Sequence, residues 1–120
     1  ENHPNQFAVE PDSDDPLTIQ AAIIIQEQAY EFISLKRLAD SLGLNPVQFT
    51  RRFQSAYHIT PSQYLKNIRM HRARSLLTET DLTLDQIAGR CGYENGFYLS
   101  RVFSQTMKMS PSQYRRTHQV

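Results

Sequence analysis

The sequence predicts an all-α protein built from two copies of one helical unit that are joined by a longer helix. One observation is an internal repeat, because residues 35–65 and 84–115 carry the same pattern at an offset that grows from 49 to 50. A second is the recurrence of apolar residues at the i, i+3, i+4, i+7 spacing of a helix. A third is the capping motif before each apolar segment. The matched pairs include Leu35/Leu84, Leu38/Ile87, Ala39/Ala88, Gly43/Gly92, Phe49/Leu99, Arg51/Arg101, Phe53/Phe103 and Tyr64/Tyr114.

The composition limits the size and the class of the protein. A chain of 120 residues forms one compact domain or two very small ones. Cys91 is the only cysteine, which excludes an intramolecular disulfide and suits a reducing cytosol. The sequence has no 18-residue apolar run and no basic-then-apolar leader, so we expect a soluble, cytoplasmic protein without a membrane span or a signal peptide. Because it starts at Glu1 rather than Met, we expect a piece of a longer protein.

The charges are distributed unevenly along the chain. Residues 1–33 hold seven acids and no lysine or arginine, whereas the remaining residues hold all 13 basic residues and the other five acids, a net charge of +8. A positive charge confined to the repeated part is what binding to a polyanion requires. A solvated basic surface without a partner is the alternative.

The segment before the repeats predicts a lead-in and one helix. Residues 1–13 are polar and contain two prolines, so we expect a linker or disordered lead-in. Asp14 or Asp15 supplies an N-cap before a first-turn proline, and the helix runs to about Tyr30. The apolar run 21–25 is wider than a one-sided stripe, so this helix is either deeply buried or docks partly against a missing neighbour. The expected segments are a lead-in at 1–13, a first subdomain at 14–60, a linker helix at 61–79 and a second subdomain at 80–120.

Each repeat opens with a short helix that presents one apolar face to the core. Ser34 caps the first of these helices, and Thr83 begins a capping box in the second. Cys91 occupies the position that Leu42 has in the first repeat. We therefore interpret Cys91 as a small buried hydrophobe rather than a reactive thiol.

A second helix follows in each repeat after a glycine-containing turn. Gly43 and Gly92 are expected in the left-handed conformation that ends a helix, and Asn45 and Asn95 cap the next one. The core face of this helix holds Phe49, Phe53 and Tyr57 in the first repeat and Leu99, Phe103 and Met107 in the second. The outward face in the first repeat holds Val47, Thr50, Arg51 and Gln54. The outward face in the second repeat holds Gly96, Phe97, Tyr98, Arg101 and Gln105.

A short helix, a glycine turn and a second helix with an arginine on its outer face form the pattern of a helix-turn-helix. The second helix of this motif fits the major groove of B-DNA, where an arginine near its start donates two hydrogen bonds to guanine. Arg51 and Arg101 occupy the same place in the two repeats, which favours this role over that of ordinary solvated arginines. Thr50 and Ser100 can contact a base or a phosphate.

A longer helix is predicted between the two motifs. It begins at the capping box 60–63 and runs to about Thr78, and the equivalent box 110–113 starts a final helix. At about 1.5 Å per residue, 18 helical residues span roughly 27 Å. That length can separate the two motifs by about one turn of duplex DNA, which is ~34 Å.

The repeated part resembles the DNA-binding domain of the AraC/XylS family of bacterial transcription regulators. The two segments that carry the resemblance are LADSLGLNPVQFTRRFQSAYHITPSQYLKNIRMHRARSLL and LDQIAGRCGYENGFYLSRVFSQTMKMSPSQYR. The resemblance covers residues 17–116. It implies about seven helices, a homeodomain-like duplicated helix-turn-helix and two recognition helices in successive major grooves. His58 and Lys108 depart from the pattern, because the family commonly has glycine in those turns.

The resemblance also implies which residues contact the bases of DNA. They are Val47, Thr50 and Arg51 in the first recognition helix, and Gly96, Phe97, Tyr98 and Arg101 in the second. The residues expected to contact the DNA backbone are Asn45, Arg52, Gln54, Arg74, Arg90, Asn95, Ser100 and Arg116. Because Gly96 has no side chain and Phe97 cannot form hydrogen bonds, the second helix is expected to contact thymine methyl groups and to recognise DNA shape.

These features predict sequence-specific binding to a non-palindromic site in double-stranded DNA. The resemblance implies an upstream ligand-sensing or dimerisation domain, and RNA polymerase as a further partner. A helical protein-interaction module that binds an acidic partner is the alternative, and DNA binding without sequence preference would favour it. The four histidines lack a metal-like spacing and the sequence has no Gly-rich phosphate loop, so we expect no enzyme activity, metal or cofactor.

Overall fold

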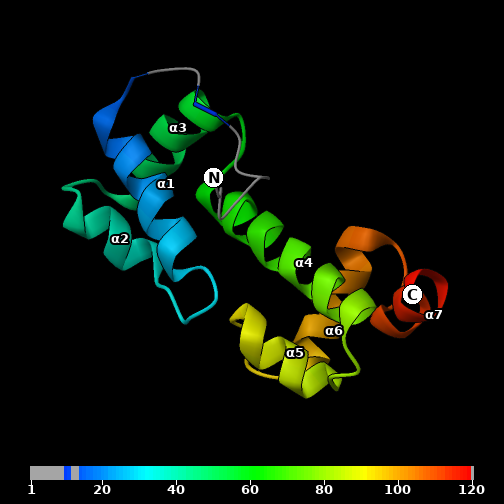
Figure 1. The fold of residues 1–120 in the computed structure, drawn as a ribbon. Helices are drawn as coiled ribbons and strands as arrows, with labels where there is room; N and C mark the ends of the chain where they lie inside the picture. Colours follow the sequence, from blue (N-terminus) through cyan, green and yellow to red (C-terminus); the bar gives the residue numbers. More distant parts are fainter. Residues whose placement is uncertain (1–9, 12–13, 120) are drawn as a thin grey trace, which may run out of the picture. The chain divides into compact units, whose positions relative to one another are not determined.

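The computed structural model describes residues 10–11 and 14–119, and over these residues the chain forms seven helices and no strand (Figure 1). The helices are α1 (Pro16–Gln28), α2 (Leu35–Ser41), α3 (Pro46–Tyr57), α4 (Pro61–Glu79), α5 (Leu84–Cys91), α6 (Gly96–Met107) and α7 (Pro111–His118). The all-α fold class is therefore confirmed. Most of the expected lead-in at 1–13 lies outside the described residues.

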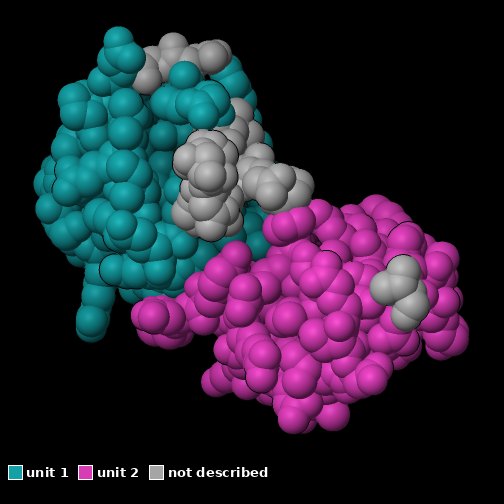
Figure 2. Space-filling model, viewed as in Figure 1, with its two compact units in different colours: residues 1–29, 33–68 teal, residues 30–32, 69–120 magenta. Residues whose placement is uncertain are grey.

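The chain divides into two compact units (Figure 2). Residues 10–11, 14–29 and 33–68 belong to the first unit, and residues 30–32 and 69–119 belong to the second. The division falls within α4, so each half of this helix supplies core residues to one unit. Each unit contains a pair of helices joined by a tight turn, α2 with α3 and α5 with α6.

Helix α1 begins where the sequence predicted and buries one face. The Asp15 carboxylate caps it by accepting a hydrogen bond from the amide of Leu17, ahead of a first-turn proline. Ile25 is completely buried, whereas Ile23 is 48% exposed. The apolar run therefore reaches past the buried face of α1, and the helix is not buried on all sides.

An aromatic cluster forms the centre of the first unit. Phe53 of α3 stacks on Tyr57 with ring centroids 4.5 Å apart, and Tyr64 of α4 meets these two rings edge-on at 5.2 Å and 5.4 Å. The Tyr64 hydroxyl accepts a hydrogen bond from the amide of Gln26 in α1, at 2.6 Å. Three helices are thus joined at one cluster, which holds α3 with its opposite face outward.

The second unit has a mixed aliphatic and aromatic core to which α4, α5 and α6 contribute. Its buried members are Met70, Ala73, Leu77, Ile87, Ala88, Cys91, Tyr93, Leu99 and Phe103. Burial raises the pKa of the Cys91 thiol to about 11, so the thiolate that a reactive cysteine needs is disfavoured. Cys91 is therefore a buried hydrophobe, as the sequence predicted.

The predicted helix caps are present throughout the described residues. Asn45, Thr83 and Ser110 each form a reciprocal capping box with the glutamine three residues later. Gly43 and Gly92 adopt φ of 77° and 92°, the left-handed conformation expected at these turns.

His58 and Lys108 also adopt the left-handed conformation, with φ of 68° and 61°. His58 ends α3 and Lys108 ends α6, at equivalent places in the two repeats. The turns thus keep the geometry that suits glycine although each carries a side chain, at a cost of roughly 1 kcal/mol per residue.

Candidate nucleic-acid interface

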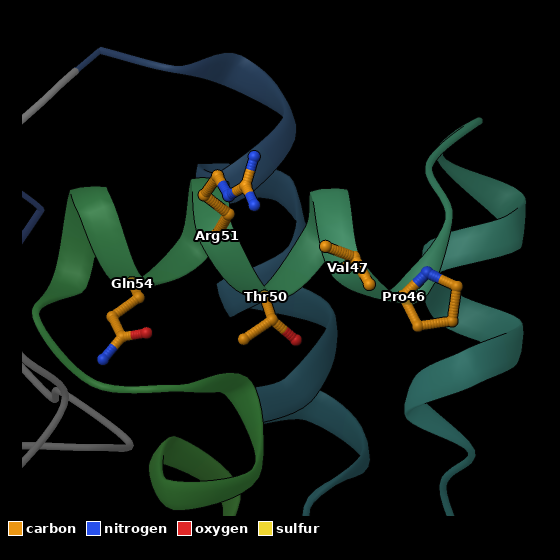
Figure 3. Close-up of a pocket in the computed structure, with 5 residues that line it drawn as sticks. All are labelled: Pro46, Val47, Thr50, Arg51 and Gln54. Atoms are coloured by element: carbon orange, nitrogen blue, oxygen red, sulfur yellow. The ribbon is translucent and has the colours of Figure 1, made fainter.

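Helix α3 presents a mixed apolar and polar face to solvent. Its buried face holds Phe49 and Phe53, and the opposite face carries Val47, which is 64% exposed, and the exposed Arg51. Together with Pro46, Thr50 and Gln54, these two side chains line a shallow hollow. Figure 3 shows Thr50 and Gln54 leaving α3 on the same side of the helix. The first set of predicted base-contacting residues therefore forms one continuous surface.

Helix α6 presents an aromatic face at its N-terminus. The Asn95 side chain caps the helix by accepting a hydrogen bond from the amide of Tyr98, at 2.9 Å. Phe97 is 77% exposed and Tyr98 is 47% exposed. The Tyr98 ring meets the ring of Tyr93 edge-on at 5.6 Å, so its orientation is supported by the core. Arg101 follows Phe97 by one turn and is exposed.

Gly96 does not belong to this outward face, and its predicted exposure is wrong. It is buried, and its amide donates a hydrogen bond to the Asp85 carboxylate at 2.7 Å. A Cβ atom on Gly96 would lie 2.9 Å from both the Cβ of Leu84 and the carboxylate of Asp85. The glycine allows close packing of α6 on α5, and its amide already has a partner in Asp85.

The arginines at the matched positions are available to a ligand. Arg51 and Arg101 are both exposed, and within the described part of the chain neither guanidinium has a hydrogen bond or an ion pair. A guanidinium without an internal partner can donate its fork of hydrogen bonds to guanine N7 and O6 or to a phosphate. The same chemistry is therefore offered at the same place in both units.

Two residues expected to contact the DNA backbone have side-chain partners inside their own units. Arg52 forms a bidentate pair with Asp15, its Nη2 and Nε atoms lying 2.7 Å and 3.0 Å from the two carboxylate oxygens. The half-buried Arg74 places its Nη1 atom 3.4 Å from the sulfur of Met107. The prediction treated both as free cations. Their long side chains reach partners on other elements that the sequence pattern does not indicate.

The other predicted backbone contacts differ in accessibility. Arg90, Arg116 and Gln54 are exposed, and Ser100 is half-buried. The side-chain oxygens of Asn45 and Asn95 accept helix-capping hydrogen bonds, which leaves their exposed amide nitrogens as donors to a phosphate.

Two exposed cations without a side-chain partner were missing from the predicted set. The side chains of Arg37 on α2 and Lys108 after α6 have no hydrogen bond or ion pair within the residues that the structure describes. The charge of these residues is visible in the sequence, but their accessibility is not.

The described residues hold no group of three or more histidine, cysteine or acidic side chains that could bind a metal ion. None of the described helices is long and apolar enough to cross a membrane.

Two helix–turn–helix units, each with an arginine on the outer face of its second helix, define a DNA-binding domain of the duplicated helix-turn-helix class. The sequence matches the model of a helix-turn-helix domain over residues 38–117. The chain belongs to the AraC-type family of transcription regulators and corresponds to the DNA-binding domain of that family. DNA-binding domains of this family are not enzymes.

Curated relatives are longer than this chain. It is 30% identical over 92 residues to the MmsAB operon regulatory protein of Pseudomonas aeruginosa, covering 77% of the chain and 30% of the relative. It is also 30% identical over 101 residues to the xylose operon regulatory protein of Escherichia coli K12, covering 84% of the chain and 26% of the relative. The chain thus spans between a quarter and a third of the length of these two relatives.

Solved structures share the fold. The C-terminal domain of AraT, a response regulator from Geobacillus stearothermophilus, is 34% identical with a TM-score of 0.82, and 88% of each chain is covered. The DNA-binding domain of AdpA, a global transcriptional factor solved in complex with a target DNA, is 31% identical with a TM-score of 0.76, covering 87% of this chain and 93% of the AdpA chain.

Proposed function

We propose that this domain recognises a specific, non-palindromic site in double-stranded DNA by placing α3 and α6 in two major grooves. The observation that carries the proposal is the pair Arg51 and Arg101, exposed and without internal partners at equivalent positions of two equivalent helices. A helix fits the major groove with its N-terminal residues nearest to the bases. Both arginines lie in the first half of their helices.

The two recognition faces carry different chemistry, which is the reason for a non-palindromic site. The α3 face offers an aliphatic side chain, a hydroxyl and an amide at Val47, Thr50 and Gln54. The α6 face offers two aromatic rings at Phe97 and Tyr98. Each face therefore favours its own base sequence, and one chain cannot place the same face on both halves of an inverted repeat.

Phosphate contacts are expected from the exposed cations outside the base-contacting set. Arg37, Arg90, Lys108 and Arg116 meet this description. Such contacts set affinity and orientation on the duplex and carry no sequence information.

We propose that the chain works within a longer protein, as a transcription regulator in the bacterial cytoplasm. The length of its relatives supports an additional ligand-sensing or dimerisation domain in the longer protein. RNA polymerase is the expected partner through which binding changes transcription.

The test is selection of bound sequences from random duplex DNA by the wild-type domain and by Arg51→Ala and Arg101→Ala. Each variant is expected to lose about 1 to 3 kcal/mol of binding free energy and to relax base preference at one end of the site only. The two relaxed positions are expected about 10 to 10.5 base pairs apart, one turn of the duplex.

Arg90→Ala is the matched control, because Arg90 is exposed but lies on α5 rather than on a recognition helix. It should weaken binding to all sequences equally. If the wild-type domain binds DNA but selects no preferred sequence, the proposal fails and the alternative of an acidic protein partner is favoured. Equal weakening for all sequences in both arginine variants would reduce Arg51 and Arg101 to phosphate contacts.

A further inference from the structure

The two recognition helices share a second equivalence besides the arginines. Val47 of α3 and Phe97 of α6 occupy the second position of their helices and match at the offset of 50 residues that relates the repeats. Both are large apolar side chains that face solvent, 64% and 77% exposed. Single exposed hydrophobic residues are common on protein surfaces. These two residues occur at the same place in both units and lie beside the proposed DNA-binding residues. This equivalence indicates a shared role.

The position of these side chains places them beside the arginines. Residues four apart on a helix lie on one face, so Val47 lies next to Arg51 and Phe97 lies next to Arg101. The apolar residue is nearer to the N-terminus in each pair. When the start of the helix enters the major groove, each arginine is therefore accompanied by an apolar side chain at the base edges.

The major groove offers one apolar group to such a side chain. Donors and acceptors fill most base edges, and the exception is the 5-methyl group of thymine. Neither Val47 nor Phe97 can form a side-chain hydrogen bond, so water removed from donor and acceptor edges would not be replaced. Contact with a methyl group buries apolar surface on both partners.

We propose that Val47 and Phe97 each recognise the 5-methyl group of a thymine that lies close to the base contacted by the neighbouring arginine. The inference rests on the proposed DNA-binding function and adds the chemistry of the bound bases. An acidic protein partner would also tolerate the arginines. Its recognition would not require an apolar side chain at the same register in both units.

The end of the site bound by α6 is expected to depend more strongly on the methyl group. Phe97 is larger than Val47 and lies beside Tyr98, whose ring is supported edge-on by Tyr93. No side chain extends from Gly96, which is held against α5. The aromatic side chains are thus the first groups that α6 brings to the groove.

The experiment replaces single thymines of the selected site by deoxyuridine, which removes one methyl group and keeps every hydrogen-bonding group of the base. With the wild-type domain, one substitution at each end should weaken binding by about three- to five-fold, as expected for one buried methyl group. Substitution of a thymine outside the two recognition segments should leave affinity unchanged. Binding is measured by fluorescence anisotropy at constant salt.

Protein variants then assign each methyl group to its side chain. Phe97→Ala should weaken binding to thymine DNA and abolish the thymine–deoxyuridine difference at the α6 end while keeping it at the α3 end. Val47→Ala should do the reverse. Gly89→Ala on α5, where a Cβ atom meets nothing within 4 Å, should keep both differences. Each variant should still discriminate thymine from deoxyuridine at the end of the site that its unchanged recognition helix contacts. This remaining discrimination shows that the variant is folded.

The inference is overturned if the wild-type domain binds a preferred site with equal affinity for thymine and deoxyuridine at every position. It is also overturned if the selected site has no thymine near the positions that Arg51→Ala and Arg101→Ala relax, or if Phe97→Ala keeps full discrimination at the α6 end. These outcomes leave the proposed function standing. The failure of the wild-type domain to select any site is the distinct result that would remove both proposals.

Discussion

Gly96 shows how one residue positions a recognition helix without taking part in recognition. Its position at the start of α6 brings the helix within van der Waals distance of the first turn of α5, where the Asp85 carboxylate accepts its amide hydrogen. The neighbouring exposed aromatic residues depend on this contact, because Phe97 and Tyr98 follow Gly96 directly. A side chain at position 96 would move the surface that we propose contacts DNA.

Gly96→Ala is expected to destabilise the domain by about 1 to 3 kcal/mol, the usual cost of overpacking a closely packed contact. Its Cβ would meet Leu84 and Asp85 at 2.9 Å, including backbone at 3.0 Å, so the neighbours cannot simply rotate away. Gly89→Ala on α5 is the control, because a Cβ there meets nothing within 4 Å. It should stabilise the domain by up to about 1 kcal/mol. Urea denaturation measures both, and an unchanged stability in Gly96→Ala would contradict the packing role.

At the scale of elements, a bidentate ion pair joins the start of α1 to the middle of α3. Asp15 both caps α1 and accepts two hydrogen bonds from Arg52. The hydrogen bond from Arg52, with further help from the amide of Leu17, holds the pKa of the Asp15 carboxyl below its usual value. The Arg52 side chain is 42% exposed and that of Asp15 is 18% exposed, so solvent weakens the pair.

Asp15→Asn is expected to lower the free energy of unfolding by about 0.5 to 1 kcal/mol at neutral pH, because asparagine keeps the helix cap and removes the ion pair. A lowered pKa means that the stabilisation is present above the ordinary pKa of 3.8 and is lost as the pH falls through the lower folded-state value. The difference between wild type and variant should therefore shrink in acid. Urea titrations across this pH range test the prediction, and a difference that grows in acid would refute it.

At the scale of the whole molecule, the charges that remain available determine how DNA binding responds to salt. Several of the 13 basic residues are used internally, as in the Arg115 side chain that donates to the carbonyls of Leu77 and Thr80 at the end of α4. The exposed cations without an internal partner among the described residues are Arg37, Arg51, Arg90, Arg101, Lys108 and Arg116. These six side chains can neutralise phosphate without first breaking a contact.

The affinity for DNA is expected to fall steeply with salt, with a log–log slope of roughly −4 to −5 for about four to six neutralised phosphates. Arg116→Ala should make the slope less steep by about one unit at most. Arg52→Ala should leave it unchanged, since that guanidinium is paired with Asp15. A salt titration of anisotropy measures the slope, and a value near zero would exclude a complex that spans two grooves.

The local structure of this protein, namely its helices, caps and turns, is determined by interactions between residues that are close in the sequence. Helix bounds, the capping boxes at Asn45 and Thr83 and the left-handed turns at Gly43 and Gly92 depend on residues within about one turn of each other, which a linear pattern records. The repeat likewise located the two arginines on the outer faces of their helices. Such interactions are local, so the sequence is sufficient to predict them.

Only the tertiary structure decided which of the candidate site residues are exposed and which already have a partner inside the protein. Arg52 meets a partner 37 residues earlier in the chain, and Gly96 meets Asp85 11 residues earlier across a helix-helix contact. Neither pairing follows from periodicity, because several carboxylates and several helix faces are compatible with the same pattern. The physical reason is that helix formation is governed by neighbours along the chain, whereas exposure and ion pairing are governed by which surfaces the core brings together.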